Sequence, residues 1–523
     1  MNRSEVEFPQ VMALSEAARF IRVSEKTLGE MARQNRIPCQ KAGREWRFLK
    51  AALEEWLKGE QGESFIAPRP QTQPSDRGPR PWKQGEFFKE KGFGDTAFSQ
   101  NRAEPLHRWV PWIAGFSSSF VDEVFDSLIP SSSKQARICD PFAGVGTTLV
   151  EGFRRGYQVI GFEINPYAAL ACQVKLSSFQ YDLPFLKRRI QKFAQFMARA
   201  QSSRTVPKSM PPAGFKSRDP FFSPHVERQV LLVLDFISDQ PETWIQDVFR
   251  VALGAVMVSF SNYSYEPSLG RRVSAGKQEI LEADVNLIMK KKLEEMERDI
   301  ELFQEELSQY AQPPNFQVFK QSYLENRPPL PPHSLDLIVT SPPYLNNYHY
   351  VRNTRPQLFW LGMVEHSSDL KQLEHSSFGK FWQTVRAGPK LELKVPVPEL
   401  IQVISGLDKA NPEGGVYGGR GWANYAVAYF NDCARFFEIT KKLMKKGGSV
   451  VVVIGNNILQ GMEIKTDHFL AAIAEHYGFK AINLHRVRTK RTGSSITNSS
   501  VRVGGNKQRV ELYETAVELR APG

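Results

Sequence analysis

The stretch RICDPFAGVGTT, residues 137–148, decides the fold of the larger part of this chain. Arg137 to Cys139 reads as a short strand, and a glycine-rich turn and a helix beginning LVEGFRRG follow it. Glycines at the carboxyl end of a first strand let the backbone pass close to a bound ligand. Strands alternating with helices continue downstream, which predicts an α/β domain built on a mainly parallel sheet.

Two further strand ends carry polar residues that suit a binding site. The stretch YQVIGFE, residues 157–163, ends in Glu163, an acid that could hydrogen-bond both ribose hydroxyls of a nucleoside. Leu335 to Val339 is another apolar strand, and TSPPY, residues 340–344, follows it directly. A lone G-x-G turn also occurs as a plain strand-to-helix connection, and SPPY alone also occurs as a plain turn. Together, however, the three strand ends favour a catalytic site.

The residue types of the SPPY loop suit a reaction at an amine that is attached to an aromatic base. The exocyclic amine of cytosine or adenine is conjugated with its ring, so its lone pair is a poor nucleophile. Acceptors such as the Ser341 hydroxyl and the Pro342 carbonyl can bind the amine hydrogens and free that lone pair, and consecutive prolines (Pro342, Pro343) hold the backbone rigid. Tyr344 offers a face on which an extruded base can stack.

DPFAGVGTT followed by GFEINP resembles motifs I and II of the class I S-adenosylmethionine-dependent methyltransferases that modify DNA amino groups. The resemblance covers roughly Trp82 to the C-terminus. HRW (107–109) and GFSSSF (115–120) are similar to motif X of that family, which closes over the cofactor. Because motif X comes first and the cofactor motifs precede the catalytic loop, the permuted order of some relatives is excluded.

The resemblance implies a full set of site residues. The catalytic residues implied are Ser341, Pro342, Pro343 and Tyr344. The residues implied to bind S-adenosylmethionine are Trp109, Phe116, Ser117, Asp140, Pro141, Phe142, Ala143, Gly144, Gly146, Thr147, Thr148, Glu163, Ile164, Asn165 and Ser322. Within this set Asp140, Phe142, Gly144 and Gly146 would line the methionine part. The family commonly places an acid after strand three, near the adenine amine, whereas this chain has KQSY (320–323), so we expect Ser322 to take its place.

The first residue of the SPPY loop, Ser341, indicates which base is modified. Within the family, serine at position 341 is most associated with cytosine N4 transfer, while adenine N6 enzymes more often have aspartate there. A carbon-5 cytosine enzyme would need a cysteine nucleophile, typically in a Pro-Cys loop after strand four. The Pro-Cys of this chain, Pro38-Cys39, lies far from position 341, so carbon methylation is not expected.

A small unit precedes this domain. Helices are predicted from Ser15, as its cap, and around Thr27 to Gln34; a hairpin is predicted over Gly43 to Phe48, and a third helix over Lys50 to Leu57. The unit resembles the excisionase-like, MerR-type winged helix-turn-helix family, in which the second helix enters the major groove. The DNA-binding residues implied are Lys26, Thr27 and Arg33 on that helix and Arg44 and Arg47 on the wing. A protein-docking domain with a solvated basic face is the alternative.

The expected fold is therefore α/β: a Rossmann-like methyltransferase sheet with a helical insertion, plus the small N-terminal domain. We expect the helix-turn-helix domain at 1–58, a linker rich in Pro, Gln, Ser and Arg at 59–85, the catalytic domain at 86–175 and 316–523, and the insertion at 176–315 as a target-recognition region. Apolar stripes at helical spacing (Leu186 to Met197 and Val285 to Phe303) predict two long helices in the insertion that pack together. The glycine-rich stretch Ala410–Gly421 predicts a mobile loop.

Basic residues suggest where DNA would bind. From Arg486 to Arg509 the chain carries several arginines and lysines and no acid, which suits a phosphate-tracking loop and equally a solvated hairpin tip. The candidates there are Arg488, Lys490, Arg491 and Arg502. Tyr263, Arg271 and Arg272 in the insertion, and Arg352 after the SPPY loop, are further candidates.

Composition agrees with this hypothesis. The net charge of +12 suits a polyanionic partner, and no apolar run reaches the length of a membrane helix. The four cysteines show no CxxC pairing, so we expect neither a metal site nor disulfides. We expect the protein in a reducing cytoplasm. We expect double-stranded DNA as substrate and a restriction-modification or phage-defence role, with a cognate endonuclease or defence-system subunits as partners. An RNA or protein amino-methyltransferase and a non-catalytic DNA-binding regulator remain alternatives.

Overall fold

The structure is a computed structural model that describes residues 9–21, 23–33, 37–42, 45–58, 93, 101–112, 115–130, 133, 135–203, 205–265, 268–324, 328–345, 350–380, 382–410, 420–490 and 511–523. The chain divides into two compact units, Met1–Lys83 and Gln84–Gly523. None of the helices in the described residues combines the length and the apolar character needed to cross a membrane. The predicted loop from Ala410 to Gly421 lies largely outside the described residues.

In its described residues the smaller unit contains three helices and a three-stranded antiparallel sheet in the order β1-β3-β2. Its elements are β1 (Val11–Ala13), α1 (Leu14–Phe20), α2 (Glu25–Arg33), β2 (Gln40–Ala42), β3 (Glu45–Leu49) and α3 (Lys50–Lys58). The expectation that Ser15 caps the first helix is wrong: Ala13 is the N-cap, and its backbone N–H donates to Glu16 Oε2 at 2.8 Å. Ser24 caps α2 by accepting from the Thr27 N–H at 3.0 Å. Met12, Leu28, Phe48 and Leu53 form the fully buried centre of this unit.

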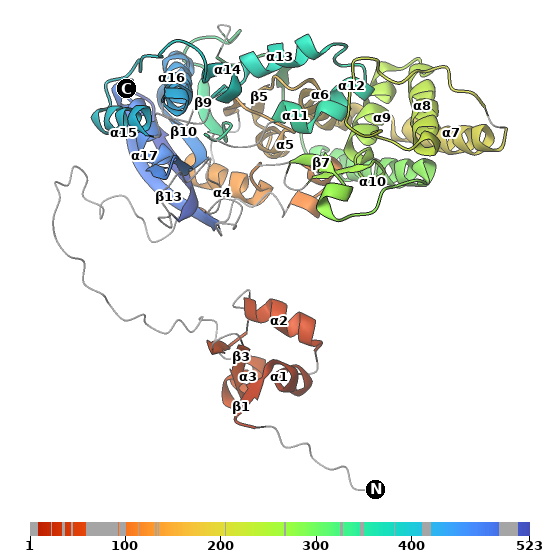
Figure 1. The fold of residues 1–523 in the computed structure, drawn as a ribbon, viewed down its shortest axis with the longest axis horizontal. Coiled ribbons are helices and arrows are strands. Elements are labelled where there is room, and N and C mark those ends of the chain that lie inside the picture. Colours follow the sequence, from red (N-terminus) through yellow and green to blue (C-terminus); the bar gives the residue numbers. More distant parts are fainter. Residues whose placement is uncertain are drawn as a thin grey trace. The chain divides into compact units, whose positions relative to one another are not determined.

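The larger unit is built on a seven-stranded sheet in the order β13-β14-β10-β9-β4-β5-β8 (Figure 1). Its strands are β4 (Arg137–Asp140), β5 (Gln158–Phe162), β8 (Phe316–Phe319), β9 (Leu335–Thr340), β10 (Met444–Gly455), β13 (Lys480–Lys490) and β14 (Leu512–Arg520). The pairs β10–β9, β9–β4, β4–β5 and β5–β8 are parallel, and β14 runs antiparallel to both β10 and β13. The strand ends predicted to carry the site therefore lie at one edge of the sheet.

Successive residues of the central strands face two separate hydrophobic cores. Ile138 on β4 belongs to one core and its neighbour Cys139 to the other, as expected for a sheet covered on both faces. The first core includes the helices α4 (Ser118–Leu128), α5 (Thr147–Arg154), α6 (Pro166–Ser177) and the insertion helices. The helices in the second are α15 (Pro398–Lys409), α16 (Arg420–Leu443) and α17 (Thr466–His476).

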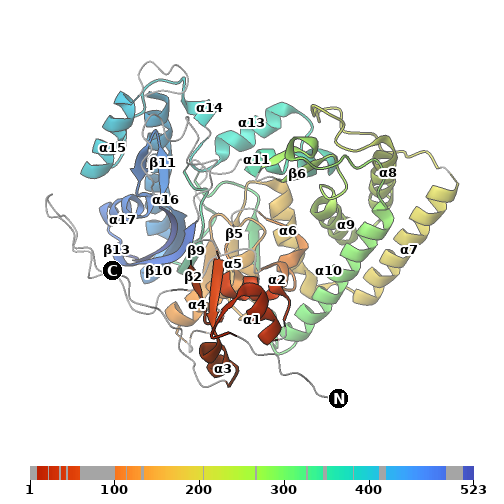
Figure 2. The same cartoon turned by 60° about the horizontal axis from the view of Figure 1, so that its bottom comes forward.

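The insertion contains α7 (Leu183–Ser202), α8 (Pro224–Ser238), α9 (Thr243–Val256), the hairpin β6 (Tyr263–Tyr265) and β7 (Leu269–Arg271), and α10 (Val285–Leu307). Both predicted apolar stripes are buried, and α7 packs against α10, which confirms their predicted role as packing faces. Figures 1 and 2 show α7 to α10 together at one end of the larger unit and α15 to α17 at the other, with β5 and β9 between them.

The remaining elements are short turns, helices and a hairpin. They are 3-10 turns at His107–Trp109, Ser178–Gln180 and Val273–Ala275, helices α11 (Tyr350–Asn353), α12 (Arg355–Trp360), α13 (Ser367–Ser376) and α14 (Trp382–Val385), and the hairpin β11 (Asn457–Leu459) and β12 (Met462–Ile464). Strand β10 begins at Met444, which pairs with Leu335 before a register shift that ends at Ser449.

Candidate active site

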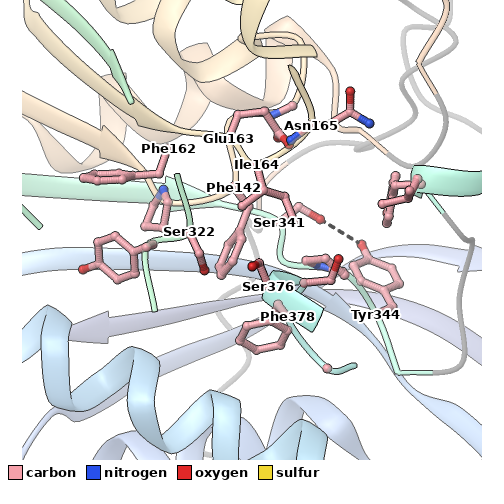
Figure 3. A pocket seen from close by; sticks show the side chains of 18 of the residues that line it. Phe142, Phe162, Glu163, Ile164, Asn165, Ser322, Ser341, Tyr344, Ser376 and Phe378 are labelled. Carbon is pink, nitrogen blue, oxygen red and sulfur yellow. Dashed lines mark hydrogen bonds between the residues drawn. The ribbon is translucent and has the colours of Figure 1, made fainter. Parts of the chain in front are cut away.

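The carboxyl ends of β4, β5 and β9 open into one cavity of about 560 Å³. Figure 3 shows that Phe142, Glu163, Asn165, Ser322, Ser341 and Tyr344 surround it. The residues named from the sequence that line it are Phe116, Asp140, Pro141, Phe142, Ala143, Gly144, Thr147, Glu163, Ile164, Asn165, Ser322, Ser341, Pro343 and Tyr344. Segments that are far apart in the chain, from Phe116 to Tyr344, therefore meet here.

The turn after β4 needs its glycines. Gly144 and Gly146 have φ values of 52° and 88°, in the left-handed region that glycine adopts without strain. Asp140 stabilises the turn, because its Oδ1 accepts from the Phe142 N–H at 3.0 Å and from the Thr340 hydroxyl at 2.6 Å. Burial raises the pKa of Asp140 to about 6, although these hydrogen bonds oppose the shift. The carboxyl group thus ties the glycine turn to β9, next to the SPPY loop.

Glu163 follows β5 and lies against the same turn. Its Oε2 accepts from the Gly144 N–H at 2.8 Å and its Oε1 accepts from the Asn165 N–H at 2.7 Å. Burial raises the pKa of Glu163 to about 7, and the nearby charge of Asp140 adds to the shift. The carboxyl group is thus held at the cavity wall and changes its charge near neutral pH.

Asn165 connects this wall to the segment after the SPPY loop. Its Oδ1 caps α6 by accepting from the Tyr167 and Ala168 N–H groups, and its Nδ2 donates to Thr354 Oγ1 at 2.7 Å. Thr354 precedes α12. The start of α6 and the chain beyond the SPPY loop are therefore fixed relative to each other.

Ser341 and Tyr344 face each other within the cavity. The Ser341 hydroxyl lies 3.5 Å from the Tyr344 hydroxyl, as the dashed line in Figure 3 shows. Burial raises the pKa of Tyr344 well above its ordinary value, so its phenol is neutral at physiological pH. The backbone at Gly455 on β10 passes close to the Tyr344 ring, where a Cβ would lie 3.3 Å from it. Pro342 is buried and is not among the lining residues.

Four residues predicted to bind the cofactor do not line the cavity. Trp109 is fully buried and donates its indole N–H to Asp299 on α10 at 2.9 Å. Ser117 caps α4, Thr148 donates to the Val339 carbonyl at 3.2 Å, and Gly146 packs against Cys172. Each contributes to the shape of the site from behind its surface.

The structure places Trp112 in the cavity, where the sequence pointed to Trp109. Trp112 stacks on Tyr350 with ring centroids 6.3 Å apart, and its Nε1 lies 3.1 Å from the position of a Cβ on Gly144. Trp112 lies between the two halves of the motif X resemblance, and this position is the sequence signal that could have identified it. A further wall of the cavity is formed by residues that follow β9 in the chain. They are Ser376, Ser377, Phe378, Gly379, Lys380, Trp382, Gln383, Arg386, Trp422 and Tyr425. No local motif marks that wall.

The residues predicted to bind DNA are scattered. In the smaller unit Thr27 is exposed on α2, Arg47 is partly buried on β3, and Lys26 and Arg33 lie on α2. In the larger unit Arg352 on α11 and Arg488 on β13 are exposed, and Lys490 ends β13. Arg44, Arg491 and Arg502 lie outside the described residues.

The three insertion residues predicted to bind DNA are engaged within the insertion. Arg271 forms an ion pair with Asp219 at 3.0 Å, and Arg272 donates to the Gln278 carbonyl at 2.9 Å. The ring of Tyr263 packs on Phe221. Arg271 therefore has a carboxylate partner already. Within the described ranges, no group of three or more His, Cys, Asp or Glu side chains could hold a metal ion.

Comparison with known proteins found a matching domain family and several similar proteins. The model of the helix-turn-helix domain family matches residues 11–61. The type II methyltransferase M.BsoBI of Geobacillus stearothermophilus is 24% identical over 442 residues, covering 76% of this chain and 84% of its own. M.AvaI of Anabaena variabilis is 24% identical over 433 residues (78% and 85%), and M.MvaI of Kocuria varians is 22% identical over 402 residues (74% and 84%). Over most of its length the chain is thus similar to type II methyltransferases, and its residues 11–61 match the model of a helix-turn-helix domain family.

Proposed function

We propose that this chain is an S-adenosylmethionine-dependent DNA methyltransferase with a Rossmann-like catalytic domain, and that it modifies an exocyclic base amine, cytosine N4. The observation that carries the proposal is the convergence of the glycine turn, Glu163 and the SPPY loop on one cavity. The names of the relatives, type II methyltransferases, support the reaction class. The order of the seven strands supports the fold, because it places all three motifs at one edge of the sheet.

The residues present fit S-adenosylmethionine. Glu163 presents a carboxyl group whose oxygens can accept from two ribose hydroxyls, and the bare backbone at Gly144 allows close approach of a ligand. Phe142 and Ile164 supply apolar surface, and Ser322 stands where the family commonly places an acid. When bound, the cofactor supplies an electrophilic methyl group on its sulfonium.

The SPPY loop would activate the acceptor. The Ser341 hydroxyl, which lines the cavity, accepts an amine hydrogen and so helps to localise the nitrogen lone pair. Tyr344 stacks on the extruded base; its neutral phenol holds Ser341 by the 3.5 Å contact. Since Cys139, Cys172 and Cys433 are buried, and burial raises the pKa of each thiol, these three cysteines offer no thiolate for carbon methylation. Serine at position 341 favours cytosine N4 over adenine N6.

Duplex DNA is the proposed substrate. The helix-turn-helix domain (1–58) would bind it, with the linker at 59–85 tethering that domain to the catalytic regions 86–175 and 316–523. The insertion (176–315) would contribute target recognition. We further propose a restriction-modification or phage-defence role with a cognate endonuclease as partner, and the type II names of the relatives support the restriction-modification role.

Methyl transfer from labelled S-adenosylmethionine to mixed-sequence duplex DNA, followed by nucleoside mass analysis, tests the proposal. We expect N4-methylcytosine, and we expect Ser341→Ala to lower the rate by on the order of 100-fold through loss of one preorganised hydrogen-bonding group. Ser308→Ala, at the exposed end of α10, is the matched control and should leave the rate unchanged.

The other outcomes are equally informative. N6-methyladenine would keep the mechanism and change the base, and transfer to RNA in preference to DNA would replace the substrate. Cofactor binding without transfer to any nucleic acid would contradict catalysis and favour the DNA-binding regulator.

A further inference from the structure

The cavity extends beyond the residues that the proposed function uses. Its additional wall comes from residues 376–386 and from the first turns of α16, both of which lie between β9 and β10 in the chain. This wall shares the cavity with Ser341 and Tyr344. A ligand that places a group at the SPPY loop therefore extends toward it.

A stack of aromatic rings and one cation forms the outer part of the wall. Trp382 on α14 stacks on Trp422 on α16 with centroids 5.2 Å apart and an interplanar angle of 30°. The guanidinium carbon of Arg386 lies over the Trp382 ring, 4.6 Å from its centroid. A guanidinium held over an indole ring is restricted in position by the cation–π contact, so it is partly preorganised for a ligand.

The backbone that carries Arg386 is clamped onto α16. Asn424 is almost fully buried, and its Nδ2 donates to the carbonyls of Val385 at 3.2 Å and Pro389 at 3.0 Å. The chain also passes so close to Gly421 that a Cβ there would lie 3.2 Å from the Arg386 Cβ. The turn holding Arg386 is therefore preorganised before any ligand binds.

The charge of Arg386 is not compensated within the described part of the chain. Lys380, in the same wall, donates to the carbonyls of His375 and Ser377 and lies 4.0 Å from Asp432. Arg386, by contrast, has no acidic side chain within ion-pairing distance among the described residues. A half-buried cation that lines a cavity and lacks an internal anion is suited to an anion brought by a ligand.

We propose that Arg386, held by Trp382, binds a backbone phosphate of the DNA strand whose target base enters the cavity. The inference rests on the proposed function and adds a substrate subsite to it. The guanidinium fork matches a phosphate bidentately, and the phosphates that flank an extruded base are the anions carried closest to the SPPY loop. The contact orients the strand and carries no sequence information.

Salt dependence of catalysis tests the subsite. With sheared genomic DNA as substrate, which supplies many candidate target sequences, kcat/KM for DNA is measured from about 50 to about 200 mM salt with the full chain. Losing one phosphate contact makes the slope of log kcat/KM against log salt shallower by about 0.9. We expect this change in Arg386→Ala, with an unchanged KM for S-adenosylmethionine.

Two matched variants isolate the cause. Arg386→Lys keeps the charge but loses the planar fork, so it should retain the wild-type slope and lower kcat/KM. Arg435→Ala removes the same charge from α16 at a position paired with Glu438 at 2.7 Å and outside the cavity lining, so it should leave the slope unchanged. Thermal unfolding of each variant separates a binding defect from misfolding.

An unchanged slope in Arg386→Ala would overturn the inference. A raised KM for S-adenosylmethionine with an unchanged slope would overturn it too, by assigning the cation to the methionine carboxylate. If the wild-type chain transfers no methyl group to DNA, the proposed function fails. Equilibrium binding of wild type and Arg386→Ala to the same DNA over the same salt range then still decides the phosphate contact.

Discussion

Cofactor affinity should depend on pH through Glu163. Burial raises the pKa of this carboxyl from 4.5 to about 7, a shift of about 2.5 units that corresponds to about 3 kcal/mol. The native state therefore holds a proton between pH 4.5 and 7 that the unfolded chain has released. Consequently the contribution of Glu163 to stability falls by about 3 kcal/mol as the pH rises across this window, and is level above it.

Ligand binding should show the opposite trend. Ribose hydroxyls donate to the ionised carboxylate, so binding favours the charged form and strengthens as the pH rises toward and through 7. At pH 5.5, about 1.5 units below the pKa, about 3% of Glu163 is ionised, and the affinity for S-adenosylhomocysteine should be about 30-fold weaker than at pH 8.5.

Isothermal titration calorimetry with S-adenosylhomocysteine from pH 5.5 to 8.5 measures this profile. Glu163→Gln cannot ionise, so its affinity should be weak and should lose the dependence around pH 7. A residual slope near pH 6 would belong to Asp140, whose pKa burial raises to about 6. A wild-type affinity that stays constant across the range, or the same slope around pH 7 in Glu163→Gln, would refute the assigned role.

Three further predictions concern the glycine turn and the SPPY loop. Gly146→Ala should lower the free energy of unfolding by about 3 kcal/mol, because the residue has a φ of 88° and its Cβ would lie 2.7 Å from Cys172 Sγ. In the double variant Gly146→Ala, Cys172→Ala, urea unfolding should show that about 1–3 kcal/mol of this loss is restored. If the effects of the two substitutions on the free energy of unfolding simply add, the proposed clash is contradicted. Burial lowers the pKa of Lys175 to about 8. The free energy of unfolding of the wild type should therefore rise by about 2–3 kcal/mol as the pH rises from 8 to 10.5. Lys175→Met should lack that gain when unfolding is measured at both pH values. Tyr344→Phe should retain most methyl transfer, whereas Tyr344→Ala should lose about 10- to 100-fold in kcat/KM with the stacking face; equal losses in both would argue for the hydroxyl instead.

Local sequence determined the elements that carry the site. The apolar run Leu335 to Val339, predicted as a strand, is β9 apart from its last residue, Thr340. The glycine turn and Glu163 could be located because each follows a short apolar strand, and strand ends are signalled by neighbouring residues alone. The same holds for the insertion stripes, whose spacing predicted buried helix faces.

Tertiary structure alone decided which side chains enter the cavity. Trp109 and Trp112 are three positions apart, yet the first is withdrawn by Asp299, some 190 residues away, while the second covers Gly144. The wall with Trp382 and Arg386 carries no local motif, because its place depends on contacts with α16 and with residues across the sheet. Patterns along the chain report hydrophobic period and turn chemistry, whereas the lining of a cavity depends on contacts between segments distant in sequence, which those patterns do not encode.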